Sequence, residues 1–106
     1  MELKRGDSFS FDFGAEYENG ETYIFQVGDI VKIGVKSRET QSMYELFKKI
    51  EVNRVTDTLT AVFDHKETKK LGIGNKTLEI ELTEKDGAVR TIYQGKITVE
   101  GDVINE

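Results

Sequence analysis

The 106-residue sequence contains no cysteine, no proline and a single histidine. Without cysteine there can be no disulfide and no thiolate chemistry, and the composition indicates no particular redox compartment. Without proline, no strand edge is blocked by a residue that lacks an N–H group. The histidine, His65, lies between Asp64 and Lys66 and has no second imidazole or cysteine with which to share a metal ion. We therefore interpret His65 as a solvated turn residue.

Long apolar runs are missing as well. No segment approaches the roughly 18 consecutive apolar residues of a membrane span, and residues 1–14 lack the apolar region of a signal peptide. The formal net charge is -5, and basic residues are interspersed with acidic ones, so the chain lacks the basic patch that a phosphate backbone requires. We expect no membrane and no nucleic acid as partners, and synthesis in the cytoplasm.

Sequence patterns of common active sites are also absent. HExxH, CxxC and GxSxG do not occur, and a serine nucleophile would have His65 as its only imidazole base. Glu79 and Glu81 share one face of an alternating segment, which we interpret as a solvated face rather than a catalytic pair. The glycines of 72–76 lack the Lys-Ser/Thr pair of a phosphate loop. We predict that the protein is not an enzyme, with no catalytic, cofactor-binding or metal-binding residue and no cofactor.

What the sequence does contain is repeated alternation of apolar and polar residues, the period of a half-buried strand. Phe9, Phe11 and Phe13 place three rings on one face, where we expect them in the core. Asn19-Gly20 favours a loop, so we predict that 8–14 and 21–27 pair as a hairpin. The other alternating segments are 31–35, 59–63, 78–82, 89–94 and 96–100.

Glycine marks the turns between these segments. Gly28-Asp29 and Asp86-Gly87 could suggest calcium, but neither has the series of oxygen ligands that a cation loop requires, so we interpret both as turns. Residues 84–87 end in Asp-Gly, which predicts a hairpin to the strand that follows. We expect Gly95 to break or bulge the last strand.

Two segments depart from simple alternation. Residues 65–72 suit a single helical turn that crosses from one sheet to another, with Leu71 entering the core. Segment 40–50 fits both helical spacing and a strand interrupted by Lys48, and we favour a strand over 44–54 because the neighbouring elements are strands. About seven or eight short strands and at most one helical turn predict an all-β sandwich or barrel, with residues 1–106 as one domain.

The order of three segments carries a family resemblance: KRGDSFSFDF (4–13), VKIGVK (31–36) and FDHKETKKLGIGNKTLEIELTEKDGAVRTIYQGKITV (63–99). It resembles small immunoglobulin-like domains encoded by phages and prophages of Gram-positive bacteria, including the N-terminal domain of baseplate upper proteins. That group has a polar turn with Leu, a Gly, a strand, an acidic-Gly hairpin and a final Thr-Ile strand. The matching residues here are Glu67-Thr68 with Leu71, Gly74, Leu78-Glu79-Ile80, Asp86-Gly87, and Thr91-Ile92 with Gly95, Ile97 and Val99.

The resemblance implies an immunoglobulin-like β-sandwich of mostly antiparallel strands. It also implies a structural or protein-interaction role in tail or baseplate assembly, with virion or tail proteins as partners and a place in the virion after assembly. It brings no catalytic residues. The alternative function is a carbohydrate-binding module associated with receptor recognition, because β-sandwiches expose aromatic side chains well. Sugar binding would be favoured if at least two of four tyrosines were exposed and coplanar: Tyr17, Tyr23, Tyr44 and Tyr93.

The outer strands of an open sandwich leave N–H and C=O groups unpaired, and these must be either protected or used. In a chain without proline, protection depends on lysines such as Lys32, Lys36, Lys48 and Lys49. Strand 8–14 has Asp12 as its only charge, and strand 96–100 carries one lysine. We predict these two strands as contact edges, for a homo-oligomer or for a docked virion partner.

Overall fold

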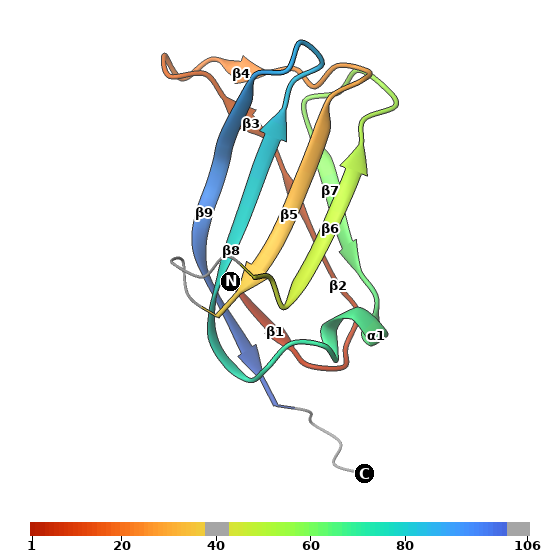
Figure 1. Ribbon diagram of the computed structural model, residues 1–106, viewed down its shortest axis with the longest axis vertical. Helices are drawn as coiled ribbons and strands as arrows, with labels where there is room; N and C mark the ends of the chain where they lie inside the picture. The colour runs from red at the N-terminus through yellow and green to blue at the C-terminus, as the bar shows by residue number, and fades with distance from the viewer. Residues whose placement is uncertain (38–42, 102–106) are drawn as a thin grey trace.

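The computed structural model describes residues 1–37 and 43–101. In these residues the chain forms nine strands and one helical turn, which confirms the prediction of a mostly β structure (Figure 1). The elements are β1 (Glu2–Lys4), β2 (Phe9–Phe13), β3 (Ala15–Glu16), β4 (Thr22–Tyr23), β5 (Ile30–Lys36), β6 (Leu46–Glu51), β7 (Leu59–Phe63), α1 (His65–Thr68), β8 (Gly74–Thr83) and β9 (Val89–Glu100).

Two layers of strands make up the molecule. A five-stranded sheet has the order β1-β9-β8-β5-β6, in which every pair is antiparallel except β1 with β9. Strands β2 and β7 form a two-stranded antiparallel sheet, which lies behind the larger one in Figure 1. The short β3–β4 pair lies at the end where the β8–β9 hairpin turns.

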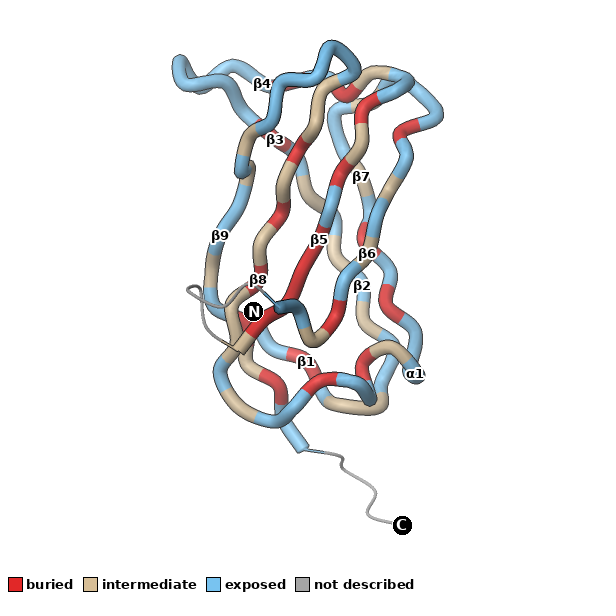
Figure 2. The backbone as a smooth tube through the Cα atoms, viewed as in Figure 1, coloured by how far each residue is buried: buried red, intermediate tan, exposed pale blue. Residues whose placement is uncertain are grey.

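The core lies between the two layers because alternation places one apolar set of each strand inward. Ile33 of β5 is paired with Ile80 of β8, and both side chains are buried. Ala61 and Phe63 of β7 are buried on the facing layer. Figure 2 shows the resulting alternation of buried and exposed positions along the strands. Burial of this apolar surface is the main stabilising term of the fold.

The predicted hairpin between 8–14 and 21–27 is wrong. Strand β2 pairs instead with β7 over all five of its residues, with Phe11 opposite Ala61. Only Ala15–Glu16 pairs with Thr22–Tyr23, as β3 with β4. The longer ladder prevails because it pairs five residues rather than two and places the apolar face of β2 beside that of β7. The phenylalanines of β2, which were expected in the core, pack against it but are only partly buried.

The preference for a strand over 44–54 is confirmed for Leu46–Glu51, the strand β6. Residues 40–42 of the alternative helix lie outside the described residues. Lys48, which interrupted the apolar alternation, is opposite Ile33 in the β5–β6 ladder. Since directly opposite residues share a face, Lys48 projects toward the core side of the sheet.

The bulge that was expected at Gly95 lies at another position in β9. Gly95 stays paired with Leu78, whereas the register shift lies beside Ile80 and leaves Ile92 of β9 as the extra residue. The ring of Tyr93 covers Gly95 so closely that a Cβ atom there would collide with it. The glycine therefore accommodates a neighbouring ring rather than breaking the ladder.

The helical turn predicted within 65–72 and its role as a crossover are confirmed. Helix α1 connects β7 of the small sheet to β8 of the large one, and Leu71 is 1% exposed. Asp64 and Glu67 form a capping box at its start, with Asp64 Oδ1 accepting from the Glu67 N–H at 2.8 Å. Thr68 is also buried, and its Oγ1 donates to the carbonyl of Asp7 and accepts from the N–H of Gly6. The turn is thus tied to the β1–β2 connection.

Candidate functional site

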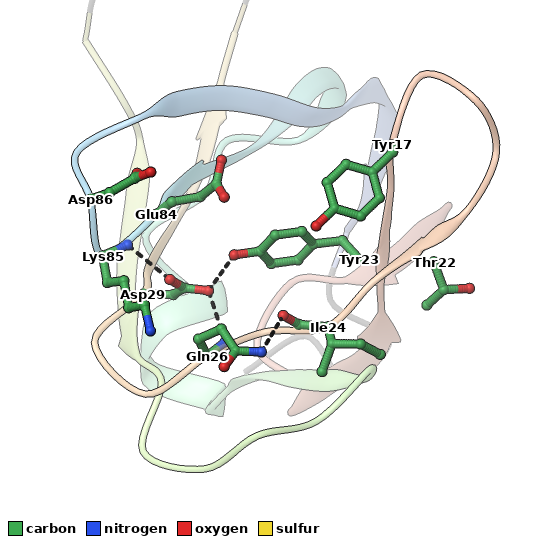
Figure 3. Close-up of a pocket in the computed structure, with 9 residues that line it drawn as sticks. All are labelled: Tyr17, Thr22, Tyr23, Ile24, Gln26, Asp29, Glu84, Lys85 and Asp86. Carbon is green, nitrogen blue, oxygen red and sulfur yellow. Dashed lines mark hydrogen bonds between the residues drawn. The ribbon is translucent and has the colours of Figure 1, made fainter.

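A buried carboxylate lies at the end of the molecule where β3–β4 and the β8–β9 hairpin meet. Asp29 is fully buried beside a hollow of about 400 Å³ (Figure 3). Its Oδ2 accepts from the Tyr23 hydroxyl at 2.7 Å and from the Gln26 N–H at 2.9 Å. Its Oδ1 accepts from the Lys85 N–H at 2.9 Å. These four residues, which we call the Asp29 cluster, join β4, the loop before β5 and the β8–β9 hairpin.

The environment fixes the protonation states in this cluster. Burial alone would raise the pKa of Asp29, but the hydrogen bonds from Gln26, Tyr23 and Lys85 outweigh it and hold that pKa below its ordinary value. Burial and the bond to Asp29 both raise the pKa of Tyr23, which therefore stays a phenol that donates. The carboxylates that line this hollow are those of Asp29, Glu84 and Asp86, and the buried one, Asp29, already accepts three hydrogen bonds. The arrangement is suited to holding three segments together.

Arg90 extends the cluster with aromatic contacts. Its guanidinium carbon lies 5.3 Å from the ring centroid of Tyr17 and 5.0 Å from that of Tyr23, within cation–π range. Nε of Arg90 lies 3.4 Å from a carboxylate oxygen of Glu84. The turn at Gly28-Asp29 was predicted, but the burial of Asp29 was not. Its most distant hydrogen-bond partner along the chain, Lys85, is 56 positions away, and no sequence signal links them.

A second cluster lies on the outer face of the five-stranded sheet. The rings of Tyr44 and Phe47 are 5.7 Å apart at 43°, and both are exposed, by 42% and 50%. The Tyr44 hydroxyl donates to Glu79 Oε2 at 3.2 Å, and the nearly buried Lys36 forms an ion pair with Glu79 at 2.8 Å. Burial and Glu79 raise the pKa of Tyr44, so its hydroxyl keeps its proton.

The four tyrosines considered for sugar binding do not form a single coplanar stacking surface. Tyr17, Tyr44 and Tyr93 are exposed, whereas Tyr23 is 3% exposed. Tyr17 meets Tyr23 edge to face at 67°. Tyr44 covers Gly34 on the outer face, whereas Tyr93 covers Gly95, which is opposite the inward-facing Leu78. The exposed aromatic partner of Tyr44 is Phe47, which the sequence interpretation did not single out.

The edge strands β6 and β7 form one long side of the molecule, which we call the protected side. The charged side chain of Lys48 connects these two strands. Lys48 Nζ donates to the carbonyl of Val62 at 2.5 Å and to Glu67 Oε1 at 3.0 Å. The same Nζ lies 5.4 Å from the ring centroid of Phe63. A lysine that points inward from an edge strand discourages another strand from pairing there. Lys49 also lies on β6, but Lys32 and Lys36 lie on the internal strand β5, so their expected role as edge protection is wrong.

The other edge of the small sheet is the strand β2, and we call this edge the open side. In the part of the chain that the structure describes, no strand pairs with the second edge of β2. The prediction of 8–14 as an edge strand is thus confirmed by β2. The prediction for 96–100 is wrong, because β1 pairs with β9 from Thr98 to Glu100. The short N-terminal strand was missed because Glu2–Lys4 has only one apolar residue to form a pattern.

Within residues 1–37 and 43–101, no three His, Asp or Glu side chains come together in a way that could hold a metal ion. The helix in this part, α1, has four residues, far fewer than a membrane-crossing helix needs. Comparison with models of known protein families, with curated proteins and with solved structures finds no match to this chain.

Proposed function

We propose that the chain is an immunoglobulin-like β-sandwich that acts, without catalysis, as a structural or protein-interaction module of a phage or prophage particle, in tail or baseplate assembly. The observation that carries the proposal is that, among the described residues, no strand pairs with the second edge of β2. This edge has no lysine, and its only charge, Asp12, accepts from Thr60 Oγ1 at 2.6 Å. The order of sequence motifs supplies the phage context.

The contact we propose is strand addition at β2. An edge strand has N–H and C=O groups that can pair with an extended segment of another chain, as in known β-augmentation complexes. The rings of Phe9, Phe11 and Phe13 are partly buried along the same strand. An added segment with apolar residues on its inward face would pair the backbone and cover these rings together. A tail protein or a second copy of this chain can supply such a segment, and the virion is then the final location.

The test has two parts. Mass spectrometry of purified phage particles should detect the chain, and the purified chain should bind at least one purified virion protein, or itself, in sedimentation experiments. Ser10→Lys places a charge on the exposed face of β2 and should weaken that association about tenfold or more. Val62→Lys is the matched control, because Val62 is opposite Ser10 on β7 and is also exposed.

Equal weakening by both variants would move the contact from the β2 edge to the face of the small sheet. A chain that is absent from particles, monomeric, and unable to bind any virion protein would contradict the proposed function.

A further inference from the structure

The outer face of the five-stranded sheet has a hollow of about 240 Å³ that the contact at β2 does not use. Tyr44 and Phe47 form one wall of this sheet-face hollow, and Gly34 lies in its floor. Lys32, Glu81 and Thr91 supply polar groups to its lining. With Glu79, which also lines it, the hollow combines an exposed aromatic wall with an amine, two carboxylates and a hydroxyl.

The aromatic wall is held in place by its surroundings. The Tyr44 ring lies against Gly34, where a Cβ atom would collide with it. Glycine weakens the interior of a strand, and here it permits the close approach of the ring. Glu79 accepts from the Tyr44 hydroxyl, and Lys36 Nζ lies 5.6 Å from the ring centroid. Tyr44 is thus fixed by its contacts although 42% of it is exposed.

The polar groups form a row across three neighbouring strands. Lys32 of β5 is opposite Glu81 of β8, and Glu81 is in turn opposite Thr91 of β9. Opposite residues of an antiparallel pair point to the same face, so all three side chains project outward. The row offers a donor, an acceptor and a group that does both.

We propose that the sheet-face hollow binds one pyranose ring of a β-linked gluco-configured saccharide. The hydroxyls of such a ring are equatorial, so its two faces present C–H groups that can pack on Tyr44 and Phe47. The hydroxyls at the ring edge then meet Lys32, Glu81 and Thr91. The hollow is smaller than the ~300–1,000 Å³ of sites for drug-sized ligands, which suits a single ring with the rest of the saccharide lying along the sheet.

The binding test uses two soluble probes, cellohexaose and chitohexaose, with sorbitol as the control polyol. Sorbitol has hydroxyls comparable to those of glucose but no rigid ring face. In an amide NMR titration, at least one hexasaccharide should shift the signals of Tyr44, Phe47, Lys32, Glu81 and Thr91, and sorbitol should not. Shifts confined to other regions, equal shifts with sorbitol, or no shift with either hexasaccharide would overturn the proposal.

Phe47→Ala separates a binding role from a folding role, because Phe47 is half exposed and its loss should leave the rest of the spectrum unchanged. This variant should raise the Kd for the bound hexasaccharide about tenfold. Val62→Ala, which removes an exposed apolar side chain from the other sheet, should leave the Kd unchanged. An unchanged Kd in Phe47→Ala would also contradict the proposed saccharide site. Ser10→Lys should not alter saccharide binding. The result for the saccharide site is therefore independent of the result for the contact at β2.

Discussion

The protected side and the open side differ in how their outer strands meet solvent. On the protected side, Lys48 projects inward from β6 and binds Val62 and Glu67 across the gap to β7 and α1. On the open side, β2 has a row of phenylalanines and no lysine. The same two layers thus combine an edge that disfavours strand addition with one that permits it, and the difference depends on one charged side chain placed among apolar ones.

The largest expected effect compares a buried side chain of the crossover with one of the open side. Leu71→Ala should lower the free energy of unfolding by about 3 kcal/mol, because Leu71 is fully enclosed beside α1. Phe11→Ala should cost about 2 kcal/mol, below the usual range for an aromatic, because part of the ring already contacts solvent. Urea denaturation measures both. A larger cost for Phe11→Ala than for Leu71→Ala would show that the open side is covered in solution and would contradict the expected difference between the two regions.

The Asp29 cluster belongs to neither side, and its contribution to stability should depend on pH. Asp29→Asn should cost about 2 kcal/mol near neutral pH, since the charged acceptor of three hydrogen bonds is lost. The folded pKa of Asp29 lies below the unfolded value of about 4. Its stabilisation is therefore present above the unfolded pKa and disappears as pH falls through the folded pKa. Urea denaturation across this acid range should show the two proteins converging, and a constant difference would contradict the assignment.

The smallest expected effect on stability is the most direct test of the protected side. Lys48→Met keeps the apolar stem and removes the charge, and because the ion pair with Glu67 is partly exposed, stability should change by less than about 1 kcal/mol. The Lys48→Met protein should nevertheless associate more than the unchanged protein as concentration rises in sedimentation velocity, because β6 becomes available for pairing. Lys49→Met is the matched control on the same strand. An equally monomeric Lys48→Met protein would show that the inward lysine does not protect this edge.

Local pattern was sufficient for much of the fold. The alternation at 31–35 and 78–82 identified the inward residues of β5 and β8, and the polar break at 65–72 identified α1 with Leu71 as its buried residue. Strand partners were harder to predict. The pairing of β2 with β7 joins residues about fifty positions apart, and the adjacent Asn-Gly turn favoured a different partner.

In the candidate sites, too, the sequence indicated single residues but not the partners that they contact. Lys48 was visible in the sequence as an interruption of an apolar face, but its bonds to Val62 and Glu67 arise only when β7 and α1 lie beside β6. Tyr44 was noticed as an aromatic, whereas its packing on Gly34 and its proximity to Phe47 depend on the β5–β6 register. Side-chain pairs across a sheet are set by register, which a single strand does not encode.

By itself, the sequence determined that this chain is built from strands, where most of them lie and which of their residues face inward, because period-two alternation is a local property of each strand. Tertiary contacts set three further features: β1 covers the end of β9, no strand of residues 1–37 and 43–101 pairs with the second edge of β2, and Asp29 is a buried acceptor. These features depend on which segments meet in space. That outcome follows from the total apolar surface and hydrogen bonding of the whole chain, and no short stretch of residues contains it.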